Sequence, residues 1–214
     1  MLIYECMKKV IIFDYDGVIV DSLDVYEKAV ISAFQKNNCN QITSRKSFLD
    51  LFDGNFFESA VKIGIPRERM PAILRELELN LQSLQIKLKL FAGIPQVLSE
   101  LAKKCKIYIV TSNLTGVVKT YLESQKIMTI EEIIGADKEV SKIKKIEYIK
   151  SKFPNGKFLY VGDTKGDMIE GKKAGVKTVA VSWGWHSVSK LKEGNPDFIV
   201  KRLNELLSLV NDLR

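Results

Sequence analysis

The sequence predicts an α/β fold in which a parallel sheet forms the core and an α-helical segment is inserted after the first strand. Two observations lead to this prediction. Along most of the chain, short apolar runs alternate with helical patterns, which is typical of a parallel sheet with right-handed crossover connections. Between Asp21 and Phe91 the alternation stops, and only helical patterns remain.

The first predicted strand is the apolar run that ends at Phe13, and two carboxylates, Asp14 and Asp16, follow it. Ligands in open α/β sheets bind just beyond the carboxyl ends of such strands. Side chains two residues apart on an extended chain point the same way, and Gly17 allows a sharp turn out of the strand. Two acids this close repel each other unless a cation or a shared proton intervenes, and Mg²⁺ prefers oxygen ligands. The pair therefore indicates a metal site, with an ordinary Asp-Gly turn as the alternative.

The inserted segment contains four apolar stripes at helical spacing. They are Val25, Ala29 and Ala33; Phe48, Leu51 and Phe52; Phe57, Ala60 and Val61; and Met70, Ile73, Leu74, Leu77, Leu81 and Leu84. A helical module inserted here would lie above the carboxyl end of the first strand. We expect it to act as a lid over the two acids.

The remaining elements follow the alternating pattern. Four further strands are predicted at Ile107–Val110, Glu132–Ile134, Phe158–Val161 and Thr178–Val181, and helices at Pro95–Lys103, Lys142–Lys152, Asp167–Ala174 and Leu203–Leu213. Gly175 marks a helix stop before the last of these strands.

Polar residues follow two of these strands directly. Thr111 and Ser112 end the second strand, where hydroxyl and backbone N–H groups suit phosphate oxygens, although a hydroxyl-rich turn is the alternative. Asp163 follows the fourth strand. Asp167 begins the next helix, where a capping role is the alternative to a functional one.

The loop after the fifth strand contains Trp183, Trp185 and His186. We expect His186 to be a surface-loop histidine. Either tryptophan could contact the inserted helices, and ordinary loop packing is an equal alternative.

Composition and charge exclude several classes of function. The net charge of +7 comes from lysines spread along the chain, which argues against a nucleic-acid partner.

The sequence predicts no membrane span and no signal peptide, and hence a cytoplasmic protein. Cys6, Cys39 and Cys105 contain no CxxC pair and are expected to be reduced thiols. Met7 reads as a natural start, which would make residues 1–6 a dispensable extension. The oligomeric state stays open.

Taken together, FDYDGVIVDS at residues 13–22, Thr111, a lysine and VGDTKGD at residues 161–167 resemble, in order, the motifs of the haloacid dehalogenase superfamily. The resemblance covers essentially the whole chain and is closest to the phosphoglycolate phosphatase-like subgroup. It implies a Rossmann-like catalytic core of residues 1–21 and 91–214 with a helical cap at residues 22–90.

The resemblance also implies roles for the polar residues. Asp14 would be the nucleophile that forms an aspartyl-phosphate, and Asp16 the general acid and base. Mg²⁺ would be held by Asp14, the backbone carbonyl of Asp16, and Asp163. Thr111, Ser112 and a lysine would neutralise the phosphoryl oxygens.

The identity of that lysine is open, because residues 141–145 offer three candidates. Lys142 fits best because it begins the helical pattern, and Lys145 is the alternative. Asp167 would orient this lysine or a metal-bound water.

These features predict a Mg²⁺-dependent phosphatase acting on a small phosphorylated metabolite. A dehalogenase would have no use for Asp16 and Asp163, and a phosphonatase would need a cap lysine that cannot be identified. A sugar phosphomutase of the same superfamily is an alternative, but the histidine expected in that subgroup aligns with Tyr26. The alternative from another class is a non-catalytic binding or regulatory protein, which would be expected to carry a damaged motif.

Overall fold

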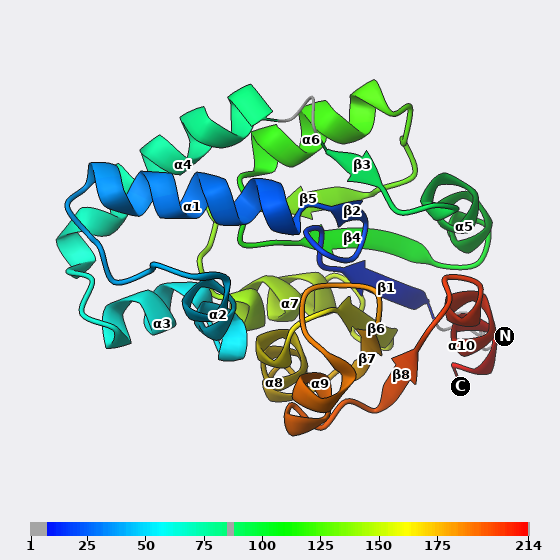
Figure 1. The fold of residues 1–214 in the computed structure, drawn as a ribbon. Coiled ribbons are helices and arrows are strands. Elements are labelled where there is room, and N and C mark those ends of the chain that lie inside the picture. The colour runs from blue at the N-terminus through cyan, green and yellow to red at the C-terminus, as the bar shows by residue number, and fades with distance from the viewer. Residues whose placement is uncertain (1–7, 85–87, 214) are drawn as a thin grey trace, which may run out of the picture.

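The computed structural model describes residues 8–84 and 88–213, and a six-stranded parallel sheet forms its centre (Figure 1). The strands lie in the order β5-β4-β1-β6-β7-β8, and β2 and β3 form a separate antiparallel pair. The strand bounds are β1 Lys9–Phe13, β2 Val20–Asp21, β3 Lys89–Leu90, β4 Lys106–Val110, β5 Glu132–Ile134, β6 Lys157–Gly162, β7 Lys177–Val181 and β8 Phe198–Val200. The predicted α/β class with a parallel sheet is confirmed.

The central strand β1 explains why the predicted strands read as unbroken apolar runs. Its side chains alternate between two hydrophobic clusters: Ile11 and Phe13 pack in one, Val10 and Ile12 in the other. Both faces of a parallel sheet are covered by helices, so every position of such a strand is buried.

The helices connect the strands and cover the sheet. Their bounds are α1 Leu23–Lys36, α2 Arg45–Leu49, α3 Phe56–Lys62, α4 Met70–Leu84, α5 Ile94–Ala102, α6 Thr115–Ser124, α7 Lys142–Ser151, α8 Lys165–Lys173, α9 Val188–Glu193 and α10 Glu205–Asp212, with short 3-10 helices η1 Asp50–Asp53 and η2 Arg67–Arg69. The four helices predicted outside the insertion occur within two residues of their expected starts. Helix α8 begins before Asp167 because the Thr164 hydroxyl caps it, accepting a hydrogen bond from the Asp167 N–H at 3.1 Å.

Four features were not predicted. The sheet has a sixth strand, β8, which pairs with β7, and helices α6 and α9 were also missed. The β2–β3 pair joins the two ends of the inserted segment, where only helical patterns were noted. Strands β2 and β3 are only two residues long, too short to show a periodic pattern, and they pair across the whole inserted segment.

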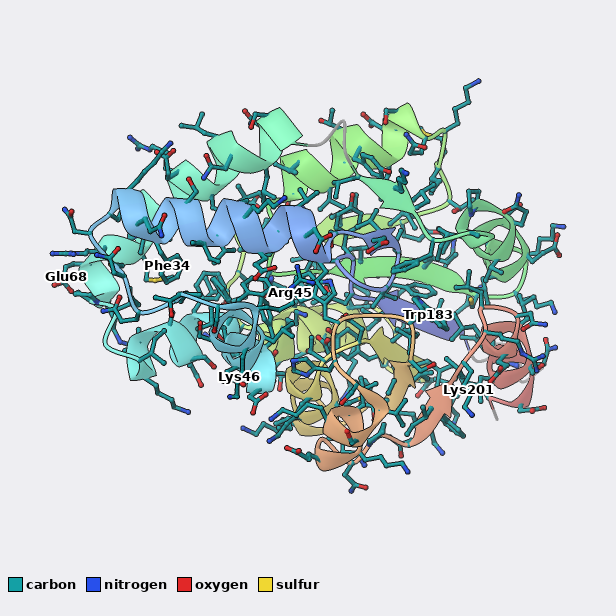
Figure 2. All side chains as sticks on the ribbon, viewed as in Figure 1. Phe34, Arg45, Lys46, Glu68, Trp183 and Lys201 are labelled. Atoms are coloured by element: carbon teal, nitrogen blue, oxygen red, sulfur yellow. The ribbon has the colours of Figure 1, made fainter. Side chains whose placement is uncertain are left out.

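Helices α1 to α4 of the inserted segment share one hydrophobic cluster, to which Val117, Ala136 and Trp185 from outside the segment also belong. Figure 2 shows Phe34 enclosed among these helices, whereas Lys46 and Glu68 lie at their outer surface. The division of the chain into a core and a cap at residues 22 and 90 stays a prediction.

Several predictions from composition can also be compared with the structure. Cys39 and Cys105 are buried free thiols. Cys6 and the expected start at Met7 lie outside the described residues. Among the helices that the structure describes, none is both long and apolar enough to cross a bilayer.

The position of β1 at the centre of the fold predicts a large cost for a cavity there. Replacing Ile12, which is fully buried, by alanine should lower the free energy of unfolding by about 2–5 kcal/mol. The matched control is Ile63→Ala, the same deletion at a side chain that is 41% exposed, which should cost less than about 1 kcal/mol. Urea unfolding of both variants tests this, and equal costs would contradict the burial argument.

Candidate active site

The predicted site residues meet at the carboxyl edge of the sheet. Asp14 follows β1, Thr111 follows β4 and Asp163 follows β6, and these three strands lie close together in the sheet order. They surround a cavity of about 10 Å³. Its lining residues are Asp14, Asp16, Tyr26, Phe52, Thr111, Ser112, Lys142, Asp163, Thr164 and Trp185. Parallel strands bring their ends to one edge, so residues from distant parts of the chain share one site.

Lys142 is the lysine that reaches the acids. Its ammonium donates to Asp14 Oδ2 at 2.7 Å and to Asp167 Oδ1 at 2.6 Å. The alternative candidate, Lys145, is also buried, but its ammonium donates to the backbone carbonyl of Thr111 at 2.6 Å. Lys145 therefore supports the loop after β4, while Lys142 contacts the carboxylates directly.

Asp167 has both of the roles that the sequence left open. Its Oδ2 accepts hydrogen bonds from the backbone N–H and the hydroxyl of Thr164, at 3.0 and 2.6 Å, which completes a capping box at the start of α8. Its Oδ1 accepts from Lys142 and from the Tyr160 hydroxyl at 2.7 Å. Both of its oxygens are thus occupied by donors from the protein.

Asp163 has one oxygen without a partner. Its Oδ2 accepts the Trp185 backbone N–H at 2.7 Å, whereas Oδ1 is buried without a hydrogen bond. Two glycines allow this close packing, because a Cβ on Gly17 would lie 2.0 Å from Asp163 Oδ2 and one on Gly184 would lie 2.2 Å from Asp163 Cβ. Gly17 also adopts a left-handed φ of 76°.

Asp16 is oriented by a residue to which the sequence assigned no role. The Asn113 amide donates to Asp16 Oδ2 at 3.1 Å, and the backbone N–H of Asn113 donates to the Thr111 hydroxyl at 2.9 Å. The hydroxyl-rich turn after β4 was the available signal, since Asn113 is the next residue after Ser112.

Burial and the surrounding charges determine the acid–base properties of the site. Burial raises the pKa of Asp14 to about 7 despite the neighbouring Lys142, and it raises the pKa of Asp16 to about 6. The pKa of Asp163 is raised well above its usual range by burial and by the charges of Asp167 and Asp14. Burial acts in the same direction on Asp167, but the adjacent Lys142 ammonium holds the pKa of that carboxyl below its usual range.

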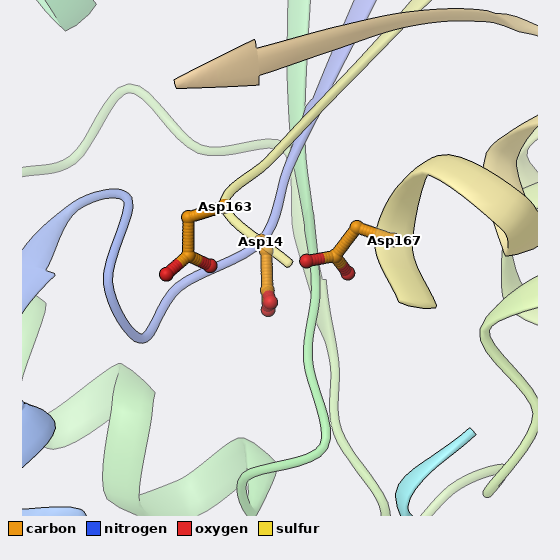
Figure 3. A group of neighbouring side chains, drawn as sticks. All are labelled: Asp14, Asp163 and Asp167. Atoms are coloured by element: carbon orange, nitrogen blue, oxygen red, sulfur yellow. The ribbon is translucent and has the colours of Figure 1, made fainter. Parts of the chain in front are cut away.

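The acids fit a divalent metal. One carboxylate oxygen each of Asp14, Asp163 and Asp167 lies within 4.8 Å of the others, and Figure 3 shows the side chains of Asp163 and Asp167 on either side of Asp14. A hard cation would supply the partner that the free Oδ1 of Asp163 lacks. The unpaired Oδ1 makes Asp163 a better candidate for a direct ligand than Asp167, whose oxygens both accept hydrogen bonds within the protein.

His186 is not a surface residue, contrary to expectation. It is 5% exposed, its Nδ1 accepts the Lys165 backbone N–H at 3.0 Å, and its Nε2 lies 3.2 Å from the Leu49 carbonyl of the inserted segment. Burial lowers its pKa. The prediction was wrong because the inserted segment, distant in sequence, covers this loop.

The two tryptophans of the same loop differ in their contacts. Trp185 packs against Tyr26, Phe48 and Phe52 of the inserted segment, with ring centroids 5.4, 5.5 and 4.9 Å away. Trp183 instead packs against Phe91 and donates to the Val18 carbonyl. Trp185 therefore forms part of both the cavity wall and the contact with the inserted helices.

Comparisons with known proteins show which family and which solved structures this chain resembles. The family model for haloacid dehalogenase-like hydrolases matches residues 11–181. A phosphoglycolate phosphatase of Synechococcus elongatus is 23% identical, with 95% of this chain and 97% of that protein aligned. The pyrophosphatase PpaX of Oceanobacillus iheyensis is 24% identical, over 95% of this chain and 97% of that protein. The structure of a predicted phosphatase from Clostridium acetobutylicum has the same fold, with a TM-score of 0.82 at 22% identity, covering 97% of this chain and all of that one.

The raised pKa of Asp14 predicts that protons compete with the metal. A carboxyl with a pKa of about 7 must lose its proton before it can bind a cation, so Mg²⁺ affinity should fall as the pH drops below about 7. The loss should be about threefold between pH 7.5 and 6.5 and should approach about tenfold per pH unit below that, since one proton is displaced from Asp14. Calorimetric Mg²⁺ titrations at pH 5.5, 6.5 and 7.5 measure this effect. Asp14→Asn should weaken the dependence without abolishing it, because the pKa of Asp163 is also raised. A wild-type affinity that is constant over this range would contradict the prediction.

The free oxygen of Asp163 predicts that this residue matters more for metal binding than Asp167. Asp163→Ala should weaken Mg²⁺ binding at least about tenfold more than Asp167→Ala, because the oxygens of Asp167 are already bonded within the protein. The same titration at one pH compares the two variants. Equal affinities would mean that both carboxylates ligate the metal.

Proposed function

This chain belongs to the haloacid dehalogenase-like hydrolases and is a phosphatase, and we propose that it hydrolyses a small phosphomonoester with Mg²⁺ through a phosphorylated Asp14. The observation that carries the proposal is the buried group of Asp14, Asp163 and Asp167, in which the Lys142 ammonium contacts Asp14 and Asp167. This group of side chains brings together a nucleophile, ligands for a divalent cation and a positive charge. Phosphoryl transfer depends mainly on such positioning and electrostatic stabilisation.

In the first step, a carboxylate oxygen of Asp14 attacks the phosphorus and the ester oxygen of the substrate leaves. Asp16 donates a proton to that oxygen, so the leaving group departs as a neutral alcohol. A pKa of about 6, raised by burial, suits a carboxyl that must hold and release a proton near neutral pH. The bond from Asn113 orients the Asp16 carboxyl for this transfer.

In the second step, Asp16 takes a proton from a water molecule that attacks the phosphorus of the aspartyl-phosphate. The bond between phosphorus and the Asp14 oxygen breaks, which releases phosphate and restores the carboxylate. Lys142 stabilises the phosphoryl oxygens in both steps, together with Thr111 and Ser112. When bound, Mg²⁺ would neutralise charge on the phosphoryl group, with Asp14, Asp163 and the backbone carbonyl of Asp16 as its ligands.

The inserted segment serves in this proposal as a cap at residues 22–90 over a core of residues 1–21 and 91–214. Tyr26 and Phe52 from this segment line the cavity beside the acids. A closed cap excludes water and strengthens the electrostatic interactions beneath it. We also place the protein in the cytoplasm, with a small phosphorylated metabolite rather than nucleic acid as its partner.

The residue at the cap entrance argues against the phosphomutase alternative. Tyr26 occupies the position of the histidine expected in that subgroup, and its pKa is raised well above 10 by burial and by the charge of Asp16. A tyrosine of that kind does not exchange protons near neutral pH.

The non-catalytic alternative is disfavoured because Asp14, Asp16, Asp163 and Asp167 are all present and gathered in one place.

Asp14→Asn tests the proposed nucleophile. The amide keeps the shape of the side chain but loses the attacking charge, so Mg²⁺-dependent hydrolysis of p-nitrophenyl phosphate should fall by at least about a thousandfold. The matched control, Asp212→Asn, makes the same change at an exposed residue and should keep full activity. Near-normal turnover in a folded Asp14→Asn variant, with folding shown by cooperative thermal unfolding, would exclude this mechanism.

A further inference from the structure

Asn113, in the loop after β4, is a buried residue that is hydrogen-bonded through both its side chain and its backbone. Its side-chain amide donates to Asp16 Oδ2 at 3.1 Å, and its Oδ1 accepts the Leu114 backbone N–H at 2.8 Å. Its own backbone N–H donates to the Thr111 hydroxyl at 2.9 Å, and its carbonyl accepts the Ala136 N–H at 2.8 Å. These four bonds hold the amide in one place beside Asp16.

The partners of the Asn113 amide also fix its direction. In the reverse orientation, the amide oxygen would face the Asp16 carboxyl and the NH₂ group would face the Leu114 N–H. The first contact would oppose two acceptors and the second would oppose two donors. Asn113 therefore presents a donor to Asp16 Oδ2, whether that carboxyl is protonated or ionised.

The two oxygens of Asp16 consequently have different surroundings. Oδ2 accepts from Asn113, whereas Oδ1 is buried without a hydrogen bond, and Asp16 lines the cavity together with Asp14 and Thr111. A neutral carboxyl carries its hydrogen on one oxygen and accepts best at the other. The donor at Oδ2 thus favours Oδ1 as the atom that carries the hydrogen. Buried polar atoms are normally paired, so a bound substrate is the natural partner of Oδ1.

Resting on the proposed function, we infer that Asn113 is a positioning residue that fixes which oxygen of Asp16 transfers the proton. In the first step, a bond forms between Asp14 and the phosphorus, the ester P–O bond breaks, and the proton on Asp16 Oδ1 passes to the ester oxygen. Negative charge then develops on the Asp16 carboxyl, which makes the hydrogen bond from Asn113 charge-assisted. The amide therefore stabilises the transition state more than the ground state. In the second step, Oδ1 takes a proton from the water molecule that attacks the phosphorus.

Two aryl phosphates that share a ring and differ in their leaving group test the inference. Phenolate is a strong base that needs a proton in order to leave, whereas p-nitrophenolate leaves readily without one. The ratio kcat/KM reports the steps up to release of the phenol, and so includes the proton donation but not the later attack of water. Asn113→Ala should lower kcat/KM for phenyl phosphate at least about tenfold more than for p-nitrophenyl phosphate.

Three further variants show whether the missing donor is the cause. Asn113→Ala leaves in place the backbone N–H that donates to Thr111, and Asn113→Asp also keeps the acceptor for the Leu114 N–H, so both should show the same dependence on the leaving group. Thr111→Val removes a contact to the phosphoryl group, which both esters share, and should lower both activities by a similar factor. The matched control, Asn204→Ala, deletes the same amide at an exposed residue that makes no side-chain cap bond and should keep wild-type activity.

A double-mutant cycle tests whether Asn113 acts through Asp16. Once Asp16 is replaced by asparagine, no proton can be donated and the position of the side chain no longer matters for the transfer. The variant with both Asp16→Asn and Asn113→Ala should therefore match Asp16→Asn alone within about twofold on phenyl phosphate. A purely structural role of Asn113 would instead lower the activity further in either background.

The outcomes separate this inference from the proposed function. If the wild-type protein hydrolyses both esters with Mg²⁺ but folded Asn113 variants lose the two activities equally, or lose neither, the proposed function stands and the inference is overturned. Additive losses in the double variant overturn it as well. If the wild-type protein hydrolyses neither ester with Mg²⁺, the proposed function fails and the inference fails with it.

Discussion

The contact of the Lys142 ammonium with Asp14 and Asp167 is the interaction on which the buried site depends. Four aspartates at this edge of the sheet, Asp14, Asp16, Asp163 and Asp167, are each less than 10% exposed. An ionised carboxylate removed from water costs several kcal/mol unless a partner compensates for it. Lys142 offsets this cost for two of them at once. Through Asp167 and its bonds to Thr164 and Tyr160, the same group of charges links α7, α8, β1 and β6.

Close backbone approach is the second constraint on the site. The loops after β1 and β7 both pack against Asp163, at Gly17 and Gly184, where any side chain would overlap the carboxylate. This packing brings the Trp185 N–H to one oxygen of Asp163 and leaves the other oxygen free. The same loop carries Trp185 into the wall of the cavity, so the geometry around Asp163 and the position of the aromatic wall depend on each other.

The third constraint is the fit of the inserted segment on the core. A Cβ on Gly166 at the start of α8 would lie 2.4 Å from the Gly54 carbonyl, so only glycine allows this approach. Asn55 donates to Glu170 and to the Val140 carbonyl, and Lys190 donates to Asp53. These contacts hold the segment against α8 and the loops around it, and they keep the cavity small. The size and lining of the cavity are therefore set by how the two parts of the chain meet.

The class of the fold, five of the six sheet strands and the polar residues that follow them could be predicted from the sequence. This was possible because a strand buried on both faces is apolar throughout, and acids directly after such strands stand out. The sequence did not predict β8, nor the β2–β3 pair, whose strands of two residues carry no periodic pattern. The assigned roles of Asp14, Asp16 and Asp163 stay predictions.

Which side chains meet depends on the packing of the whole chain. Lys142 and Lys145 are three residues apart on one helix and are both buried, so local pattern does not separate them, and only their positions relative to β1 and β4 show which one reaches Asp14. The burial of His186 and the pairing of Tyr26 with Trp185 likewise depend on contacts across the whole chain. Periodicity reports which side of an element is buried, whereas the identity of a buried side chain's partner depends on the packing of elements that are distant in sequence.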